Sequence, residues 1–176
     1  KLQDDCYFIN YYTKRDNWDN CNSDNLIKSS KLALEFKDSD KSKYFKKVFN
    51  FLDNIILSNI VLCCVPSHKE ANLEHSITSL VKLLSKNGRI DGSNCLIRSK
   101  TIQKISSPNS DRSEQVHLNS IKEQNTHLFI NKNVLLLDDI VTSGNSMRAC
   151  SKILMQPNKG TIGAKSILKL AVWKTI

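Results

Sequence analysis

The 176-residue chain contains few residues that interrupt regular secondary structure, with only 5 glycines and 3 prolines. Most of it is therefore free to form helices and strands. Its 6 cysteines include no pair in the Cys-x-x-Cys spacing, which argues against a zinc ribbon or a thioredoxin-like site. The sequence also lacks a signal-peptide pattern and any apolar run of about 18 residues. We expect a cytoplasmic protein with reduced thiols and no membrane association. Because the sequence starts at Lys1 rather than at a methionine, a targeting segment can be missing from it.

Positive charge outweighs negative charge, but the excess is not gathered in one place. The 26 Lys and Arg residues exceed the 17 Asp and Glu residues, which gives a formal net charge of +9. Such an excess favours anionic partners, including phosphorylated small molecules, RNA and DNA. The lysines are scattered and arginine is scarce, so a generally lysine-rich proteome is the simpler explanation.

The hydrophobic pattern divides the chain near residue 57. Before it, a strand-like patch at 6–12 is followed by a helix that starts after 22–24 and by a second helix that starts near Ser39 and Asp40. We therefore expect residues 1–57 to form a largely helical extension and residues 58–176 to form the core domain. The composition, with 40% apolar and 24% charged residues, is that of a globular protein.

Residues 58–176 alternate between strand and helix patterns. The apolar runs at 60–65 and 133–137 are typical of strands buried on both faces of a parallel sheet. Further strands are predicted at 94–97, 127–130 and 164–173, helices at 72–86 and 146–155, and a long mobile loop at 98–115. This alternation predicts an α/β fold with a mostly parallel sheet flanked by helices.

One segment combines the groups that a phosphorylated sugar needs. The apolar strand at 133–137 is followed by Asp138 and Asp139, and then by a turn of hydroxyl-bearing and small residues that opens a helix. Ligands of open α/β sheets bind at the carboxyl ends of the strands. Gly144 lets the backbone approach an anion, and N–H groups at the helix start donate to it. The carboxylates suit a sugar diol, so the segment indicates a site for ribose 5-phosphate. The alternative is a solvated acidic turn followed by an ordinary helix cap.

Residues 134–146 resemble the phosphoribosyl-pyrophosphate (PRPP) signature of type I phosphoribosyltransferases. That signature has four apolar residues, two acidic residues, two apolar residues, and then Thr, Thr or Ser, Gly, any residue, and Thr or Ser. The resemblance implies an α/β fold of that type in which the catalytic pair Asp138 and Asp139 contacts the ribose hydroxyls. It also implies a 5-phosphate site that consists of Thr142, Ser143, Gly144, Asn145 and Ser146.

The same resemblance suggests where the rest of PRPP binds. Type I enzymes bind pyrophosphate on a loop after the first core strand, which corresponds here to Ser67, His68 and Lys69. They also cover the substrate with a mobile loop, corresponding to 98–115, in which Arg98 and Arg112 are candidate contacts. For His68 and for the loop arginines, a solvated surface position is the alternative.

A member of this family displaces pyrophosphate from C1 of PRPP by a nitrogen nucleophile, and a nucleobase is the expected acceptor. Mg²⁺ is the expected cofactor because the hard oxygens of diphosphate and ribose hold it with few protein ligands. Asp138 and Asp139 would contribute to its site only indirectly. Family members are often homodimers.

Two other functions stay open. The chain can be a non-catalytic module that senses PRPP or a nucleotide and regulates a partner. It can also be an accessory protein of DNA uptake or processing, because Arg98, Gln103 and Arg112 are loosely similar in spacing to ComF-type phosphoribosyltransferases. The zinc-binding cysteine pairs of that branch are missing here.

Overall fold

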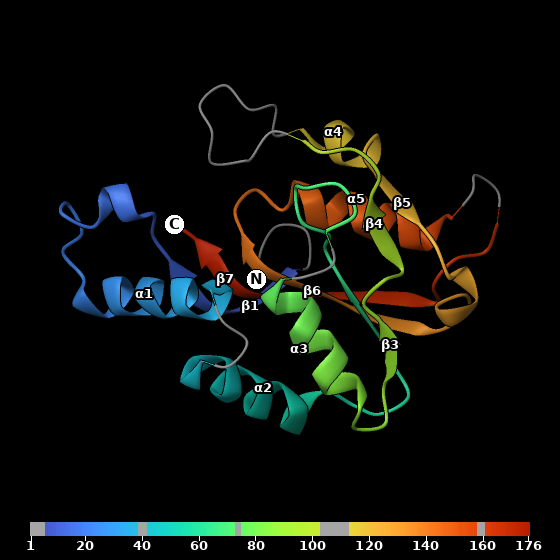
Figure 1. The fold of residues 1–176 in the computed structure, drawn as a ribbon, viewed down its shortest axis with the longest axis horizontal. Coiled ribbons are helices and arrows are strands. Elements are labelled where there is room, and N and C mark those ends of the chain that lie inside the picture. Colours follow the sequence, from blue (N-terminus) through green and yellow to red (C-terminus); the bar gives the residue numbers. More distant parts are fainter. Residues whose placement is uncertain (1–5, 39–41, 73–74, 103–112, 158–160) are drawn as a thin grey trace.

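A computed structural model describes residues 6–38, 42–72, 75–102, 113–157 and 161–176. Its centre is a five-stranded sheet of order β1-β7-β6-β2-β3, in which every pairing is parallel (Figure 1). The predicted α/β fold with a mostly parallel sheet is therefore confirmed. The five strands are β1 Cys6–Tyr12, β2 Val61–Cys64, β3 Ile90–Gly92, β6 Asn133–Val141 and β7 Ser166–Thr175.

Helices cover both faces of this sheet. Three of them, α1 (Asp24–Asp38), α2 (Lys43–Ile55) and α3 (Ser76–Ser85), lie on one face. The opposite face carries α5 (Asn145–Met155), which packs against the short helix α4 (Glu114–Leu118). A small antiparallel sheet of β4 (Leu96–Arg98) and β5 (Ile121–Glu123) lies on the α5 side. Two short 3₁₀ helices, η1 (Arg15–Asn17) and η2 (Thr126–Leu128), complete the described elements.

The central strands are buried on both faces, as their continuous apolar runs predict. Leu62, Leu135 and Leu137 pack in the cluster that contains the residues of α1, α2 and α3. Their neighbours along the strands, Val61 and Leu136, pack on the other face, in the cluster that includes residues of α5. Helices on both sides of a parallel sheet demand this arrangement, because neither face of a central strand meets solvent.

The N-terminal segment is built into the same sheet. Strand β1 pairs with β7 along its whole length, from Cys6 beside Lys169 to Tyr12 beside Thr175. Trp173 of β7 is fully buried, and its ring lies 5.4 Å from that of Phe36 in α1. Residues 1–57, expected as an extension, thus supply an edge strand of the sheet and two of the helices that cover it.

The structure corrects three local predictions. The strand predicted at 127–130 is wrong, because Asn125 takes a left-handed conformation (φ 51°) and the chain turns into η2 instead. The strand predicted to end at residue 137 continues to Val141. Arg98, assigned to the loop at 98–115, is the last residue of β4, whereas Arg112 lies outside the described residues. Strands β3 and β5 and helix α4 were not predicted, since three to five residues carry no readable periodicity.

Candidate functional site

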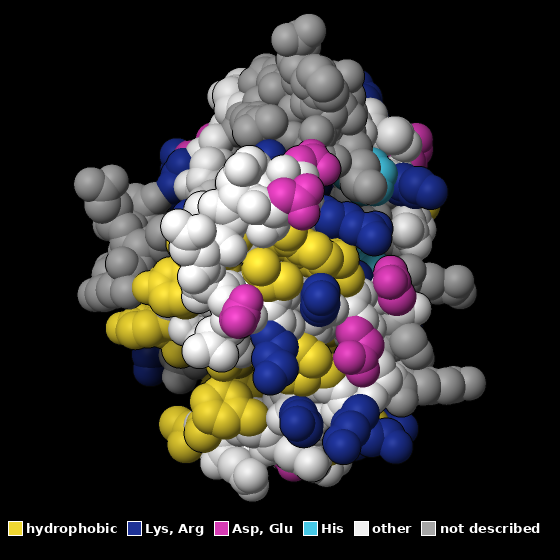
Figure 2. All heavy atoms as spheres, turned by 90° about the vertical axis from the view of Figure 1, so that its left-hand side faces the viewer, with side chains coloured by type: hydrophobic (Ala, Val, Ile, Leu, Met, Phe, Trp, Pro, Cys, Tyr) yellow, Lys and Arg dark blue, Asp and Glu magenta, His cyan; other side chains and the backbone are white. Residues whose placement is uncertain are grey.

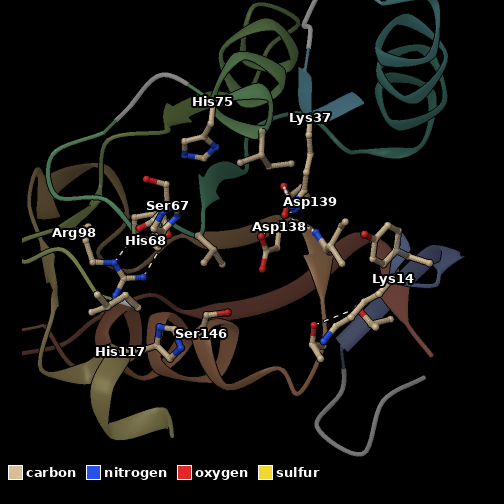
Figure 3. Close-up of a pocket in the computed structure, with 18 of the residues that line it drawn as sticks. Lys14, Lys37, Ser67, His68, His75, Arg98, His117, Asp138, Asp139 and Ser146 are labelled. Atoms are coloured by element: carbon tan, nitrogen blue, oxygen red, sulfur yellow. Dashed lines mark hydrogen bonds and ion pairs between the residues drawn. The ribbon is translucent and has the colours of Figure 1, made fainter. Parts of the chain in front are cut away.

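A cleft of about 440 Å³ opens at the carboxyl ends of the parallel strands. The residues after β1, β2, β6 and β7 meet at this edge of the sheet because the strands all run in the same direction. In Figure 3, the acidic pair lies between the loop after β2 on one side and Lys14 on the other. Of the predicted site residues, those that line the cleft are Ser67, His68, Arg98, Asp138, Asp139, Thr142 and Ser146.

The turn after β6 has the shape of an anion site. Gly144 caps α5 with φ 80°, a left-handed conformation that glycine adopts without strain. A Cβ there would lie 3.4 Å from Nη1 of Arg148, which donates to the carbonyl of Ser143 at 3.2 Å. The first N–H groups of α5 have no carbonyl within their own helix to bond. This turn therefore presents donors and a helix N-terminus at the edge of the cleft.

The side chains of the turn divide between the cleft and the rest of the fold. Thr142 and Ser146 line the cleft. The hydroxyl of Thr142 is also 3.1 Å from that of Thr175 at the end of β7. The Ser143 hydroxyl accepts from the N–H of Asn145 at 3.5 Å, and the Asn145 side chain accepts from Arg148. Ser143, Gly144 and Asn145 thus belong to the predicted turn but are not among the residues that line the cleft.

The two carboxylates at the end of β6 have different surroundings. Asp138 is 8% exposed, and its Oδ1 accepts from the N–H of Asp139 at 2.9 Å. Asp139 is half-buried, and its Oδ2 lies 3.0 Å from Nζ of Lys37 in α1. Burial, and then the charge of Asp139, raise the pKa of Asp138 well above its ordinary value. Burial is the largest influence on the pKa of Lys37 and works to lower it, but the charge and hydrogen bond of Asp139 and the charge of Asp138 together raise the pKa. The pair is therefore one shielded carboxyl beside one ion-paired carboxylate.

Replacing Asp138 by Asn is expected to raise the free energy of unfolding near neutral pH. Because the folded pKa of this carboxyl is above its unfolded value, ionisation costs the folded state stability. That cost is absent below the unfolded pKa, grows as the pH rises above it, and levels off above the folded pKa. The Asn oxygen can still accept from the N–H of Asp139. Urea unfolding of the variant and the native protein should show a larger gain in the free energy of unfolding at about pH 7 than at about pH 4. The exposed change Asp19→Asn is the control, and an equal gain at both pH values contradicts the expectation.

The loop after β2 is held by backbone and side-chain contacts. The carbonyl of His68 accepts from the N–H of Ile102 at 3.0 Å, and the Ser67 hydroxyl donates to the carbonyl of Lys69 at 3.4 Å. Ser67 and His68 line the cleft, whereas Lys69 is exposed and is not among its lining residues. Arg98 is only 3% exposed, so it is not the solvated loop charge that the alternative interpretation describes.

Several cleft residues come from parts of the chain that the sequence did not indicate. The N-terminal segment supplies Tyr12, Lys14 and Lys37, while His75 precedes α3. Lys37 sits in the last turn of α1, where a lysine is common on any helix, so no local signal separates it from its neighbours. Its carbonyl accepts from the buried Ser76 hydroxyl at 2.7 Å, which anchors the end of α1 beside α3.

Comparison with known families adds to this geometry. A family model described as the phosphoribosyl transferase domain matches residues 99–167. This match supports a type I phosphoribosyltransferase-like family for the domain, and the parallel sheet flanked by helices is consistent with that fold. The matched part of this domain contains β5, β6, the turn at 142–146 and α5, and supports phosphoribosyl transfer as its general chemistry. Lys37 and the loop after β2 lie outside the matched part. No curated protein matches the chain.

The described residues of this phosphoribosyltransferase-like domain hold no group of three or more His, Cys, Asp or Glu side chains that could bind a metal ion. Mg²⁺ in phosphate sites takes one or two carboxylates and otherwise water and ligand oxygens, so such a group is not required for it. Asp138 and Asp139 at the edge of the cleft fit that limited role. Within the described ranges, no helix is long and apolar enough to cross a membrane.

Proposed function

We propose that this domain binds PRPP with Mg²⁺ in the cleft and transfers the phosphoribosyl group to a nitrogen nucleophile, with a nucleobase as the acceptor. The observation that carries the proposal is the convergence of two loops on one cleft. The acidic pair and the turn at 142–146 follow β6, and the loop with Ser67 and His68 follows the neighbouring strand β2. A sugar diol, a phosphate and a diphosphate would thus each meet suitable groups.

Each part of PRPP has its own partners in this proposal. The 5-phosphate binds to the N–H groups at the start of α5 and to the hydroxyls of Thr142 and Ser146. The helix dipole adds only about 0.3–1 kcal/mol, so the converging hydrogen bonds matter more. The ribose hydroxyls donate to Asp138 and Asp139, and the diphosphate lies on the loop after β2.

The reaction breaks the bond between C1 and the diphosphate oxygen and forms a bond between C1 and nitrogen. The leaving diphosphate keeps the electron pair of the broken bond, and positive charge builds on the ribose ring. Asp139, which is ion-paired with Lys37 at 3.0 Å, holds the ring together with Asp138, and the pair favours that charge. Mg²⁺ would neutralise the diphosphate and hold it in line for departure. The acceptor loses its nitrogen proton, which passes to the diphosphate or to solvent.

A non-catalytic PRPP or nucleotide sensor is the second candidate. The observation in its favour is the ion pair between Lys37 and Asp139, which engages one ribose-binding carboxylate with another part of the chain. A ligand that displaces Lys37 would alter the contact between α1 and the sheet. Such a module binds PRPP without turnover.

On one face of the molecule, the arrangement of charged side chains does not support a role in DNA processing. Figure 2 shows Lys and Arg side chains there interspersed with acidic and hydrophobic ones, over the side formed by the N-terminal segment. Non-specific binding to the DNA backbone needs several cations that contact successive phosphates.

The proposal is tested by calorimetric titration of the native chain with PRPP, with and without Mg²⁺. A hexose 6-phosphate, which has no diphosphate, is the control ligand. Binding that needs Mg²⁺ and that the control does not reproduce supports the site, and pyrophosphate release in the presence of a nucleobase panel supports the enzyme. Binding without release favours the sensor. If PRPP does not bind, both functions are wrong.

A further inference from the structure

Arg98 is a buried cation whose donors are used within the protein. It is 3% exposed, and its Nε donates to the carbonyl of Ser67 at 2.9 Å. Nη1 donates to the Ser120 hydroxyl at 2.6 Å, and Nη2 to the carbonyl of Pro66 at 3.4 Å. Burying a guanidinium is costly unless its donors are bonded, so these three contacts fix its position closely. Two of the three acceptors belong to the loop that follows β2.

The segment that begins with Arg98 holds the same loop at three further points, two through its backbone and one through a side chain. The carbonyl of Arg98 accepts from the N–H of Ala71 at 3.0 Å, and the Thr101 hydroxyl accepts from the N–H of Glu70 at 3.0 Å. The N–H of Ile102 donates to the carbonyl of His68 at 3.0 Å. Hydrogen bonds from residues 98–102 thus hold the loop of residues 66–71 in its conformation.

The contacts of the guanidinium also set the direction of the loop N–H groups. In a trans peptide the carbonyl and the following N–H point in opposite directions. Because Arg98 draws the carbonyls of Pro66 and Ser67 toward itself, the N–H groups of Ser67 and His68 point away from it. Successive N–H groups held in one direction make a concavity for an anion. Arg98 and the loop residues Pro66, Ser67 and His68 all line the cleft.

We propose that Arg98 is a positioning residue for diphosphate, which fixes the loop of Pro66, Ser67 and His68 through its carbonyls and does not act as a ligand contact. The inference rests on the proposed function, which places the diphosphate on this loop and the 5-phosphate at the start of α5. The positive charge of Arg98 alone does not perform this role, because the role needs a planar fork that reaches two carbonyls and Ser120.

The test compares Arg98→Gln and Arg98→Lys with native protein in titrations of inorganic pyrophosphate with Mg²⁺ and, separately, of ribose 5-phosphate. Both variants are expected to bind pyrophosphate about tenfold or more weakly and ribose 5-phosphate within about twofold of native. Lys122→Gln, an exposed change on β5 beside β4, removes the same charge and should leave both affinities unchanged. Thermal unfolding checks that each variant is folded.

The outcomes separate this inference from the proposed function. Near-native pyrophosphate binding by Arg98→Lys would show that charge alone suffices, and would overturn the positioning role. Equal loss of affinity for pyrophosphate and for ribose 5-phosphate would also overturn it, because a general loss of structure then explains the result. If the Arg98 variants do not fold, Ser120→Ala removes one partner of the guanidinium, and a selective loss of pyrophosphate affinity is again required. A native chain that binds neither ligand refutes the proposed function, and the inference with it.

Discussion

Exchanging both carboxylates of the acidic pair for amides, as Asp138→Asn/Asp139→Asn, is expected to weaken PRPP binding by about 100-fold or more. In the proposed complex each carboxylate accepts a ribose hydroxyl, and a hydrogen bond to a charged group contributes about 1.5–3 kcal/mol. Asn has nearly the same shape as Asp, so the end of β6 should keep its conformation. Calorimetric titration with PRPP and Mg²⁺ measures the effect.

The matched control for this variant is Asp19→Asn/Asp91→Asn. It removes the same two charges from exposed positions that are not among the residues lining the cleft. The affinity of this control variant for PRPP should stay within about twofold of the native value. Weakening of similar size in both double variants would indicate a general electrostatic effect, and native-like affinity of Asp138→Asn/Asp139→Asn would exclude the ribose role.

Trp173→Ala is expected to lower the free energy of unfolding by about 3–5 kcal/mol. The ring is fully buried between the sheet and the N-terminal helices, 5.4 Å from Phe36 and 5.6 Å from Tyr44. Its Nε1 also donates to the Ser29 hydroxyl of α1 at 3.2 Å. Truncation therefore removes the apolar contacts that join α1 to β7. Urea unfolding followed by circular dichroism gives the change.

Phe51→Ala serves as the comparison for the tryptophan variant. Phe51 lies on α2 and is 49% exposed, so its truncation leaves little cavity and should cost about 1 kcal/mol or less. If Trp173→Ala costs no more than Phe51→Ala, the N-terminal helices do not depend on this ring for their place on the sheet.

The sequence predicts well those parts of the site in which neighbours along the chain are also neighbours in space. Residues 133–155 form strand, turn and helix in the predicted order, because an apolar run, a glycine turn and a helical stripe are all local signals. The strand nevertheless runs through Asp138 and Asp139 to Val141, since pairing with β7 continues beyond the apolar residues. Pairing with a distant strand is not visible in a local pattern.

The remaining parts of the cleft depend on contacts between distant segments. Lys37 meets Asp139 only because α1 packs over β6 and β7, and Arg98 is buried only because the loop of Pro66 and Ser67 accepts its hydrogen bonds. In the sequence, Arg98 adjoins a polar stretch and resembles a loop charge. The partners that bury it are known only once the fold is known.

The position of β7 between β1 and β6 also has a consequence for how the chain folds. Strand β1 has its pairing partner only after β7 has formed, and the paired residues Cys6 and Lys169 lie far apart in sequence. Closing so long a loop is entropically costly, and topologies with such distant pairings fold slowly. During synthesis, a nascent chain that has not reached Ser166 holds β1 without its partner, with strand edges open to mispairing. We therefore expect the N-terminal strand to join the sheet late in folding.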